Sequence, residues 1–169
     1  LLVAVADMRA TDRLTTDDLA AVPGLIAGAD LLVVDANPPP QVVGWLLDQA
    51  ATAGVPAVVE PVSVAKAGGL APVLAGGRPV HTVTPNADEL QALVGGAAPR
   101  SVAAVVAAAG VLHDRGVAHV WVRRGPAGSL LSSRDGGDGP ARVRLVGAPR
   151  TQVVDVTGAG DSMTAGYVH

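Results

Sequence analysis

Residues 155–166 read DVTGAGDSMTAG, and this stretch decides the fold that the chain is expected to adopt. Glycine is unfavourable inside a helix, so Gly158 and Gly160 are interpreted as the turn that delivers the chain into one. The helix then runs through residues 162–165, with Asp161 in its first turn. Backbone N–H groups at the start of a helix have no internal partner and carry the positive end of the helix dipole. The stretch therefore predicts an anion site, and phosphate is the commonest such anion.

Short apolar runs alternate with helical patterns in the rest of the chain. The predicted strands cover residues 1–6, 31–37, 56–61, 80–85 and 118–124, and the predicted helices cover residues 16–28, 40–53, 65–75, 87–95 and 101–115. Strands that are apolar without alternation are covered on both faces, which predicts an α/β fold with a mostly parallel sheet flanked by helices. The later runs SLLSS and ARVRLVG flank the loop RDGGDGP, which predicts a hairpin and an antiparallel edge.

Composition excludes several classes of function. The 169 residues suit one domain, and the net charge of −3, with no clustered arginines, argues against a nucleic-acid binder. The absence of cysteine excludes disulfides, thiolate catalysis and cysteine-ligated zinc, and it fits a cytoplasmic protein. The most apolar helical run, residues 102–112, is shorter than the roughly 18 residues of a membrane span. Composition therefore argues against a nucleic-acid partner and against a membrane partner, and it names no other partner.

Acidic side chains follow several of the predicted strands. In open parallel sheets, ligands bind beyond the carboxyl ends of the strands. Carboxylates repel a phosphate that is bound at the start of a helix. Their presence there makes chemical sense if a cation lies between the carboxylates and the phosphate, or if one carboxylate acts as a base. The polar residues at these ends are Asp7, Asp35, Asn37, Glu60, Asn86, Glu89, Arg123, Asp155 and Asp161.

Some of these residues belong to two short motifs, NADE and RRGPAG, each of which also allows a purely structural interpretation. In NADE, residues 86–89, Asn86 and Glu89 form a capping box by default, which is the more frequent case, but they are also suited to hold the hydration shell of Mg²⁺. In RRGPAG, residues 123–128, the default is a strand that ends in a turn. The alternative is a close approach of a nucleotide to the backbone.

Rival phosphate motifs and metal motifs fit poorly. The only lysine, Lys66, is followed by Ala67, so the chain has no P-loop. The spacing of Gly158, Gly160 and Met163 does not match a dinucleotide fingerprint. The loop RDGGDGP lacks the closing glutamate of a calcium loop, and the four histidines show no metal-ligand spacing.

With TPNADE and DVTGAGDS present in this order, the chain resembles the ribokinase/PfkB family of carbohydrate and nucleoside kinases. The stretches VADM (5–8), LLVVDAN (31–37) and VPAVVEPVSVAK (55–66) extend the likeness over nearly the whole chain. The resemblance implies a ribokinase-like fold whose N-terminal lid and C-terminal end are absent here. Residues 1–169 are then expected to be a fragment, a single α/β domain that holds the nucleotide-binding and catalytic part.

The resemblance also implies a reaction, the ATP-dependent phosphorylation of a sugar or nucleoside hydroxyl, with pseudouridine as the favoured acceptor. Asp161 would be the catalytic base, and the amides of Gly158, Ala159 and Gly160 would form the anion hole. A homodimer would form through the lid that these residues lack.

The resemblance to the family also implies which residues contact the cofactors. Gly125 and Gly128 would contact the nucleotide, and Asn86 and Glu89 would serve Mg²⁺. Asp155 and Thr157 match positions around a monovalent cation, typically K⁺. Two positions depart from the pattern: Arg123 stands near the nucleotide where a small hydroxyl residue is usual, and Glu60 stands where aspartate is expected.

Two alternatives stay open on the sequence. A degenerate kinase domain that binds nucleotide or sugar without turnover is favoured by the missing lid and opposed by the intact Asp161 and Glu89. A reductase on a Rossmann sheet would reveal itself by nicotinamide binding, and the spacing of the glycines disfavours it.

Overall fold

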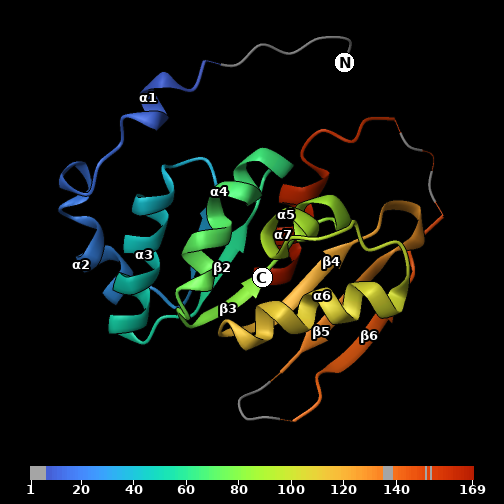
Figure 1. Cartoon of the computed structure of the whole chain (residues 1–169). Coiled ribbons are helices and arrows are strands. Elements are labelled where there is room, and N and C mark those ends of the chain that lie inside the picture. The colour runs from blue at the N-terminus through green and yellow to red at the C-terminus, as the bar shows by residue number, and fades with distance from the viewer. Residues whose placement is uncertain (1–6, 135–138, 151, 153) are drawn as a thin grey trace.

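A six-stranded sheet with helices on both faces organises the chain (Figure 1). The computed structural model describes residues 7–134, 139–150, 152 and 154–169. In chain order the elements are α1 (Arg9–Asp12), the 3₁₀ turn η1 (Asp17–Leu19), α2 (Val22–Ala27), β1 (Leu32–Asp35), α3 (Pro40–Ala53), β2 (Ala57–Glu60), α4 (Val64–Ala75), β3 (Val80–Val83), α5 (Ala87–Val94), α6 (Val102–Asp114), β4 (Val117–Arg123), the 3₁₀ turn η2 (Gly125–Ala127), β5 (Ser129–Ser133), β6 (Arg142–Val146) and α7 (Ala159–Val168).

The sheet topology confirms the predicted fold class. The strands lie in the order β1-β2-β3-β4-β5-β6, with β1 to β4 parallel and with β5 and β6 antiparallel to their neighbours. Each parallel step crosses through a helix, as βαβ units require. The predicted hairpin is the β5–β6 pair. The strand expected at residues 1–6 lies outside the described residues.

Local sequence signals set the ends of the helices. The N-terminus of α4 is capped by the Ser63 hydroxyl, which accepts from the N–H of Lys66, and that of α6 by Ser101, which accepts from Ala104. Gly54 ends α3 with a φ of 70°, a left-handed conformation that glycine adopts without strain. These boundaries fall within one residue of the predicted ones.

The helix predicted over residues 16–28 is wrong in its extent. The chain forms two shorter pieces there, η1 and α2, joined by a turn. The carboxylate of Asp18 accepts from the N–H and the hydroxyl of Thr15, which fixes a tight local turn before η1. Pro23 has no N–H to donate back along a continuous helix, but it fits the first turn of a new one.

The core lies between the sheet and α3 to α6, which cover one face in Figure 1. On the opposite face, α7 docks through Tyr167, whose hydroxyl lies 2.8 Å from the Thr82 hydroxyl and whose ring meets Trp121 edge-on at 4.8 Å. The sheet therefore separates an apolar layer from a more polar one. The largest fully buried side chains include Leu47, Leu70, Leu74, Leu90, Leu93 and Leu112.

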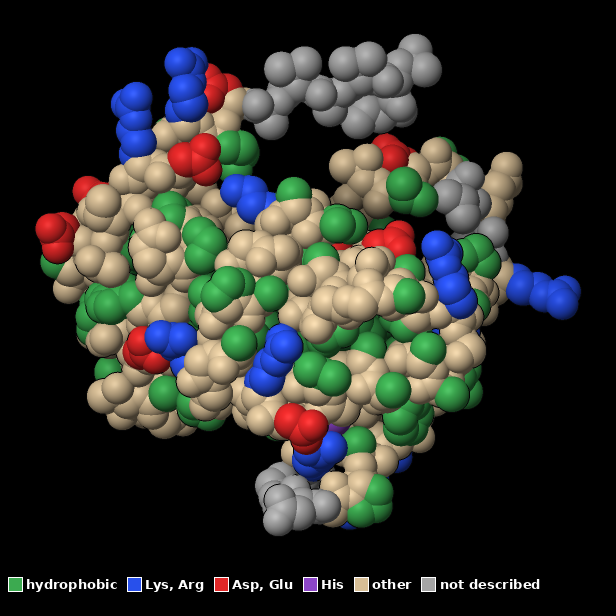
Figure 2. Space-filling model, in the orientation of Figure 1, with side chains coloured by type: hydrophobic (Ala, Val, Ile, Leu, Met, Phe, Trp, Pro, Cys, Tyr) green, Lys and Arg blue, Asp and Glu red, His purple; other side chains and the backbone are tan. Residues whose placement is uncertain are grey.

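The α1 segment contributes nothing to this core. It has no buried residue and projects from the body in Figure 1, and Figure 2 shows charged side chains of both signs at that end. Among the helices in the described part of the chain, none combines the length and the apolar character needed to cross a membrane.

His113 is a buried histidine that lies between α6 and the antiparallel edge of the sheet. Its Nδ1 lies 2.7 Å from the Val117 carbonyl oxygen, which can only accept, so Nδ1 carries the proton and Nε2 faces the Ser132 hydroxyl at 2.9 Å. Burial lowers the pKa of His113 below its ordinary value of 6.5, and the charge of Arg134 lowers it further, against the Val117 carbonyl and Asp114. The folded chain thus favours the neutral ring.

We expect the free energy of unfolding to fall as the pH drops below about 6.5, because the unfolded chain then binds a proton that folded His113 resists. The loss is complete once the pH is below the folded pKa. Urea unfolding between pH 7.5 and 5 measures this slope. His113→Gln should flatten it, whereas His169→Gln, at the exposed end of α7, should leave it in place. An unchanged slope in His113→Gln would contradict the assignment.

Candidate active site

The start of α7 has the geometry that the glycine-rich stretch predicts, with one correction. Gly158 is the N-cap, with a φ of 72°, and Asp161 lies in the first turn of the helix. Gly160 lies inside that first turn rather than in the turn before it, because the left-handed Gly158 alone reverses the chain. The first N–H groups of α7 therefore face the carboxyl edge of the sheet with the positive end of the helix dipole.

The start of α5 confirms the capping interpretation of NADE. The Asn86 side-chain oxygen accepts from the N–H groups of Asp88 and Glu89 at 3.0 and 2.8 Å. In return, Oε2 of Glu89 accepts from the N–H of Asn86 at 2.8 Å, which completes the capping box. The cap uses Oε2, so Oε1 of Glu89 stays available for a further ligand.

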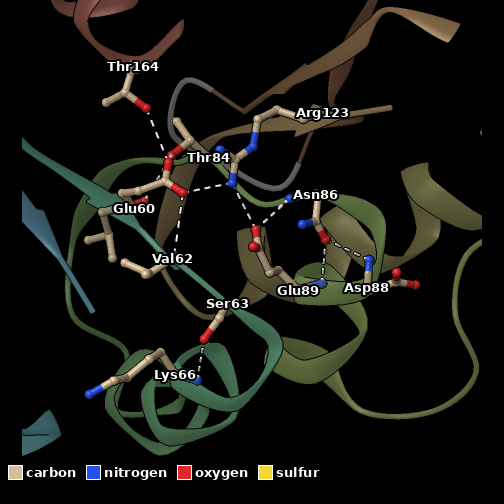
Figure 3. A network of polar contacts seen from close by, with 11 residues as sticks. Glu60, Val62, Ser63, Lys66, Thr84, Asn86, Asp88, Glu89, Arg123 and Thr164 are labelled. Carbon is tan, nitrogen blue, oxygen red and sulfur yellow. Dashed lines mark hydrogen bonds and ion pairs between the residues drawn. The ribbon is translucent and has the colours of Figure 1, made fainter. Parts of the chain in front are cut away.

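Glu60, at the end of β2, is buried and accepts several hydrogen bonds (Figure 3). Its Oε2 accepts from the hydroxyls of Thr84 and Thr164, the latter at 3.1 Å and from α7. Its Oε1 accepts from the N–H of Val62 at 3.4 Å. Val62 is β-branched and has a φ of 68°, so the backbone is strained beside this carboxylate.

Arg123, the last residue of β4, joins Glu60 to Glu89 (Figure 3). Its Nη2 donates to Oε1 of Glu60 at 2.7 Å and to Oε2 of Glu89 at 2.9 Å. The side chains of Arg123, Glu60 and Glu89 are 20%, 8% and 4% exposed, so both contacts lie away from bulk water, where charges interact strongly. One guanidinium thus holds two buried carboxylates.

These residues meet at one cavity of about 450 Å³. A second cavity of about 550 Å³ shares Asp35, Glu60 and Asp161 with it and continues along α7 as far as Val168. Asp161 thus stands between the two. Of the site residues predicted from the sequence, the first cavity brings together Asn86, Glu89, Arg123, Gly158, Ala159, Gly160 and Asp161.

Four predicted site residues do not line that cavity. Gly125 is the first residue of η2 and Gly128 follows its last, in the turn that the default interpretation of RRGPAG expects. Gly128 has a φ of 79°, and a Cβ there would collide with the carbonyl oxygen of Val146 in β6, so the strand pairing alone requires glycine.

Asp155 and Thr157 contact each other in an exposed turn before α7. One Asp155 oxygen accepts from the Thr157 N–H at 2.9 Å and from its hydroxyl at 2.8 Å. The backbone N–H and then the hydroxyl of Thr157 lower the pKa of Asp155, so this carboxylate is ionised. Their role around a monovalent cation stays a prediction.

The cavity also contains residues that the sequence prediction did not select as site residues. Asp35, Asn37 and Glu60 were recognisable only as polar residues that close a strand. Asp35 pairs in register with Glu60, and Asn37 donates to Asp35 at 2.7 Å. Thr84 and Thr164, which donate to Glu60 but do not line this cavity, gave no signal at all, because an isolated threonine is common on any element.

The donor chemistry of the cavity fits Mg²⁺ with an incomplete protein shell. Mg²⁺ prefers oxygen ligands, and it usually keeps several waters and takes one or two carboxylates plus substrate phosphates. Within the described ranges no three acidic, histidine or cysteine side chains converge closely enough to hold a metal ion by themselves. Oε1 of Glu89 is the oxygen that would hold it.

Comparisons with known proteins agree on one group of relatives. The model of the family described as pfkB family carbohydrate kinase matches residues 4–169. The chain is 35% identical over 168 residues to the pseudouridine kinase of Escherichia coli strain K12, covering 98% of this chain and 50% of that enzyme.

Solved structures show the same similarity. A carbohydrate kinase from Agrobacterium tumefaciens superposes with a TM-score of 0.74 at 27% identity, over 99% of this chain and 50% of that one. The Arabidopsis thaliana ribokinase complexed with ribose and ATP shares the fold, with a TM-score of 0.67 at 23% identity over 92% and 46% of the two chains. The chain therefore spans about half the length of the relatives it matches.

Proposed function

The chain belongs to the pfkB family of carbohydrate kinases, and from this premise we propose that it carries the phosphoryl-transfer site of an ATP-dependent sugar or nucleoside kinase. The observation that supports the proposal is the single cavity in which Asp161 and the Gly158 turn face the carboxylates at the ends of β2 and α5. Residues 1–169 would form one domain with this site at the carboxyl edge of its sheet.

Asp161 is the proposed base. It is exposed, it lies in the first turn of α7, and it lines both cavities. Its carboxylate would accept the proton of the acceptor hydroxyl while the acceptor oxygen bonds to the γ-phosphorus of ATP and the bond from that phosphorus to ADP breaks. The N–H groups from Gly158 to Gly160 would stabilise the charge on the transferring group.

Glu89 and Asn86 are proposed to hold Mg²⁺ through the free Oε1 of Glu89 and through coordinated water. The metal ion, when bound, would neutralise charge on the β- and γ-phosphates. Asp155 and Thr157 would support the anion hole through a monovalent cation. Gly125 and Gly128 would let the nucleotide lie against the backbone of η2.

A nucleoside, with pseudouridine first, is the proposed acceptor. The support is the 35% identity to a pseudouridine kinase over nearly the whole chain. The chain spans 50% of the length of that enzyme, so acceptor choice has to be measured directly.

We expect ADP release from ATP and Mg²⁺ to depend on a nucleoside acceptor and to rise when K⁺ is added. The assay compares pseudouridine, other nucleosides, ribose and fructose, using both this chain and the gene product that carries it. Release of ADP with pseudouridine, together with no binding of nicotinamide cofactors, supports the kinase over the reductase. Nucleotide binding without turnover in the gene product, with every acceptor, would favour the degenerate kinase domain instead.

A further inference from the structure

Arg123 is the one cationic side chain among the described residues that line the first cavity. Four carboxylates line the same cavity: Asp35, Glu60, Glu89 and Asp161. An ATP molecule adds more negative charge, so a phosphate in this cavity would be stabilised by positive charge that turns toward it. A guanidinium does not deprotonate in proteins, so its charge can move between partners but cannot be removed.

The guanidinium of Arg123 has bonding capacity left over. Its Nη2 serves both Glu60 and Glu89, but its Nε is buried and has no hydrogen-bond partner among the described residues. A buried donor without a partner is costly, so it marks a place where a ligand would be stabilised.

The same guanidinium lies against the first turn of α7. A Cβ on Gly160 would collide with Nη1 of Arg123, so a side chain at that position would displace the guanidinium. Nη1 of Arg123 therefore lies beside the positive end of the α7 dipole, and both favour an anion.

We infer that Arg123 exchanges partners when phosphate enters: it holds Oε2 of Glu89 in the nucleotide-free chain and turns to the phosphate when ATP binds, which leaves the negative charge of Glu89 uncompensated and draws the divalent cation to its Oε1. This inference rests on the proposed function. Arg123 would be a positioning residue for the metal, and its positive charge would keep a divalent cation away from Glu89 until phosphate arrives. Metal and nucleotide would then bind together rather than separately.

The test is a titration with Mn²⁺, which replaces Mg²⁺ and whose free form is counted by electron paramagnetic resonance. Without nucleotide, Arg123→Met should bind Mn²⁺ at least about tenfold more tightly than the unaltered chain, because Glu89 loses its cationic partner. With a non-hydrolysable ATP analogue present, Arg123→Met should bind the analogue about tenfold more weakly. A purely structural role for Arg123 would weaken both.

The neighbouring Arg124 provides the matched control, since it does not line the cavity: Arg124→Met should leave both affinities unchanged. Adding Glu89→Gln to Arg123→Met should remove the gain in Mn²⁺ affinity. If Arg123→Met melts far below the unaltered chain, Arg123→Gln, whose amide still donates one hydrogen bond, is used for the same titrations.

Equal Mn²⁺ affinity with and without the arginine, or a gain that survives Glu89→Gln, would overturn the inference. Neither titration needs an acceptor or turnover. A negative result in the titrations can therefore be distinguished from a negative result in the kinase assay. An inactive protein that still shows the opposite shifts would support the exchange and contradict the kinase.

Discussion

Asp161→Asn is expected to lower kcat for phosphoryl transfer by about 10²–10⁴-fold, the usual contribution of a positioned general base. Asparagine keeps the size of the side chain but cannot accept the acceptor's proton. Asp161 is exposed in the first turn of α7, so the folded state should survive the change. The measurement is ADP release at saturating ATP and acceptor, together with the affinity for ATP, which should change little.

Asp88→Asn is the matched control for this experiment. Asp88 also lies in the first turn of a helix, α5, but it does not line the first cavity. Its substitution should leave kcat within a factor of about two, since removing one exposed carboxylate changes local electrostatics only slightly. Comparable losses in both variants, or full turnover in Asp161→Asn, would refute Asp161 as the base.

Glu60→Ala is expected to destabilise the fold by about 3–5 kcal/mol. The substitution removes the carboxylate that accepts from Arg123, Thr84 and Thr164, and it leaves a partly buried guanidinium with one carboxylate partner instead of two. Because Thr164 belongs to α7, the change also removes a contact that holds this helix to the sheet. Urea unfolding at neutral pH, followed by circular dichroism, measures the loss.

Asp48 and Arg78 provide a control with the same ion-pair distance. Asp48 Oδ1 lies 2.7 Å from Nε of Arg78, as Glu60 Oε1 does from Nη2 of Arg123, but the Asp48 side chain is 52% exposed. Asp48→Ala should therefore cost no more than about 1 kcal/mol. Equal losses at the two sites would mean that burial does not set the strength of the Glu60 contacts.

Sequence patterns predicted the fold wherever the controlling signal is local. Short apolar runs separated by helical patterns predicted the four parallel strands β1 to β4 and the helices between them. Each βαβ unit is formed by residues that are near one another in the sequence, so its signal is local. The glycines at 158 and 160 predicted the start of α7 for the same reason. The helix over residues 16–28 was wrong because Pro23 interrupts an otherwise helical pattern.

The candidate site was predicted only in its local parts. The capping box of Asn86 and Glu89 spans three residues and is readable from spacing alone. Arg123 contacts Glu60 and Glu89, which lie 63 and 34 positions before it in the sequence, so no rule of sequence spacing predicts these contacts. Polar residues at the ends of predicted strands indicated which side chains could belong to a site. Only the sheet order shows that the last side chains of β2 and β4 reach the same cavity.

The parallel register of β1 and β2 restricts how this protein can evolve. Asp35 lies beside Glu60, and successive side chains of a strand point to opposite faces. One residue inserted before Glu60 would turn its carboxylate toward the apolar layer under α3 and α4. Insertions and deletions within β2 should therefore abolish the site, whereas the buried valines of β2 should tolerate replacement by residues of similar volume. The number of residues in β2 should thus matter more to this site than the identity of its buried valines.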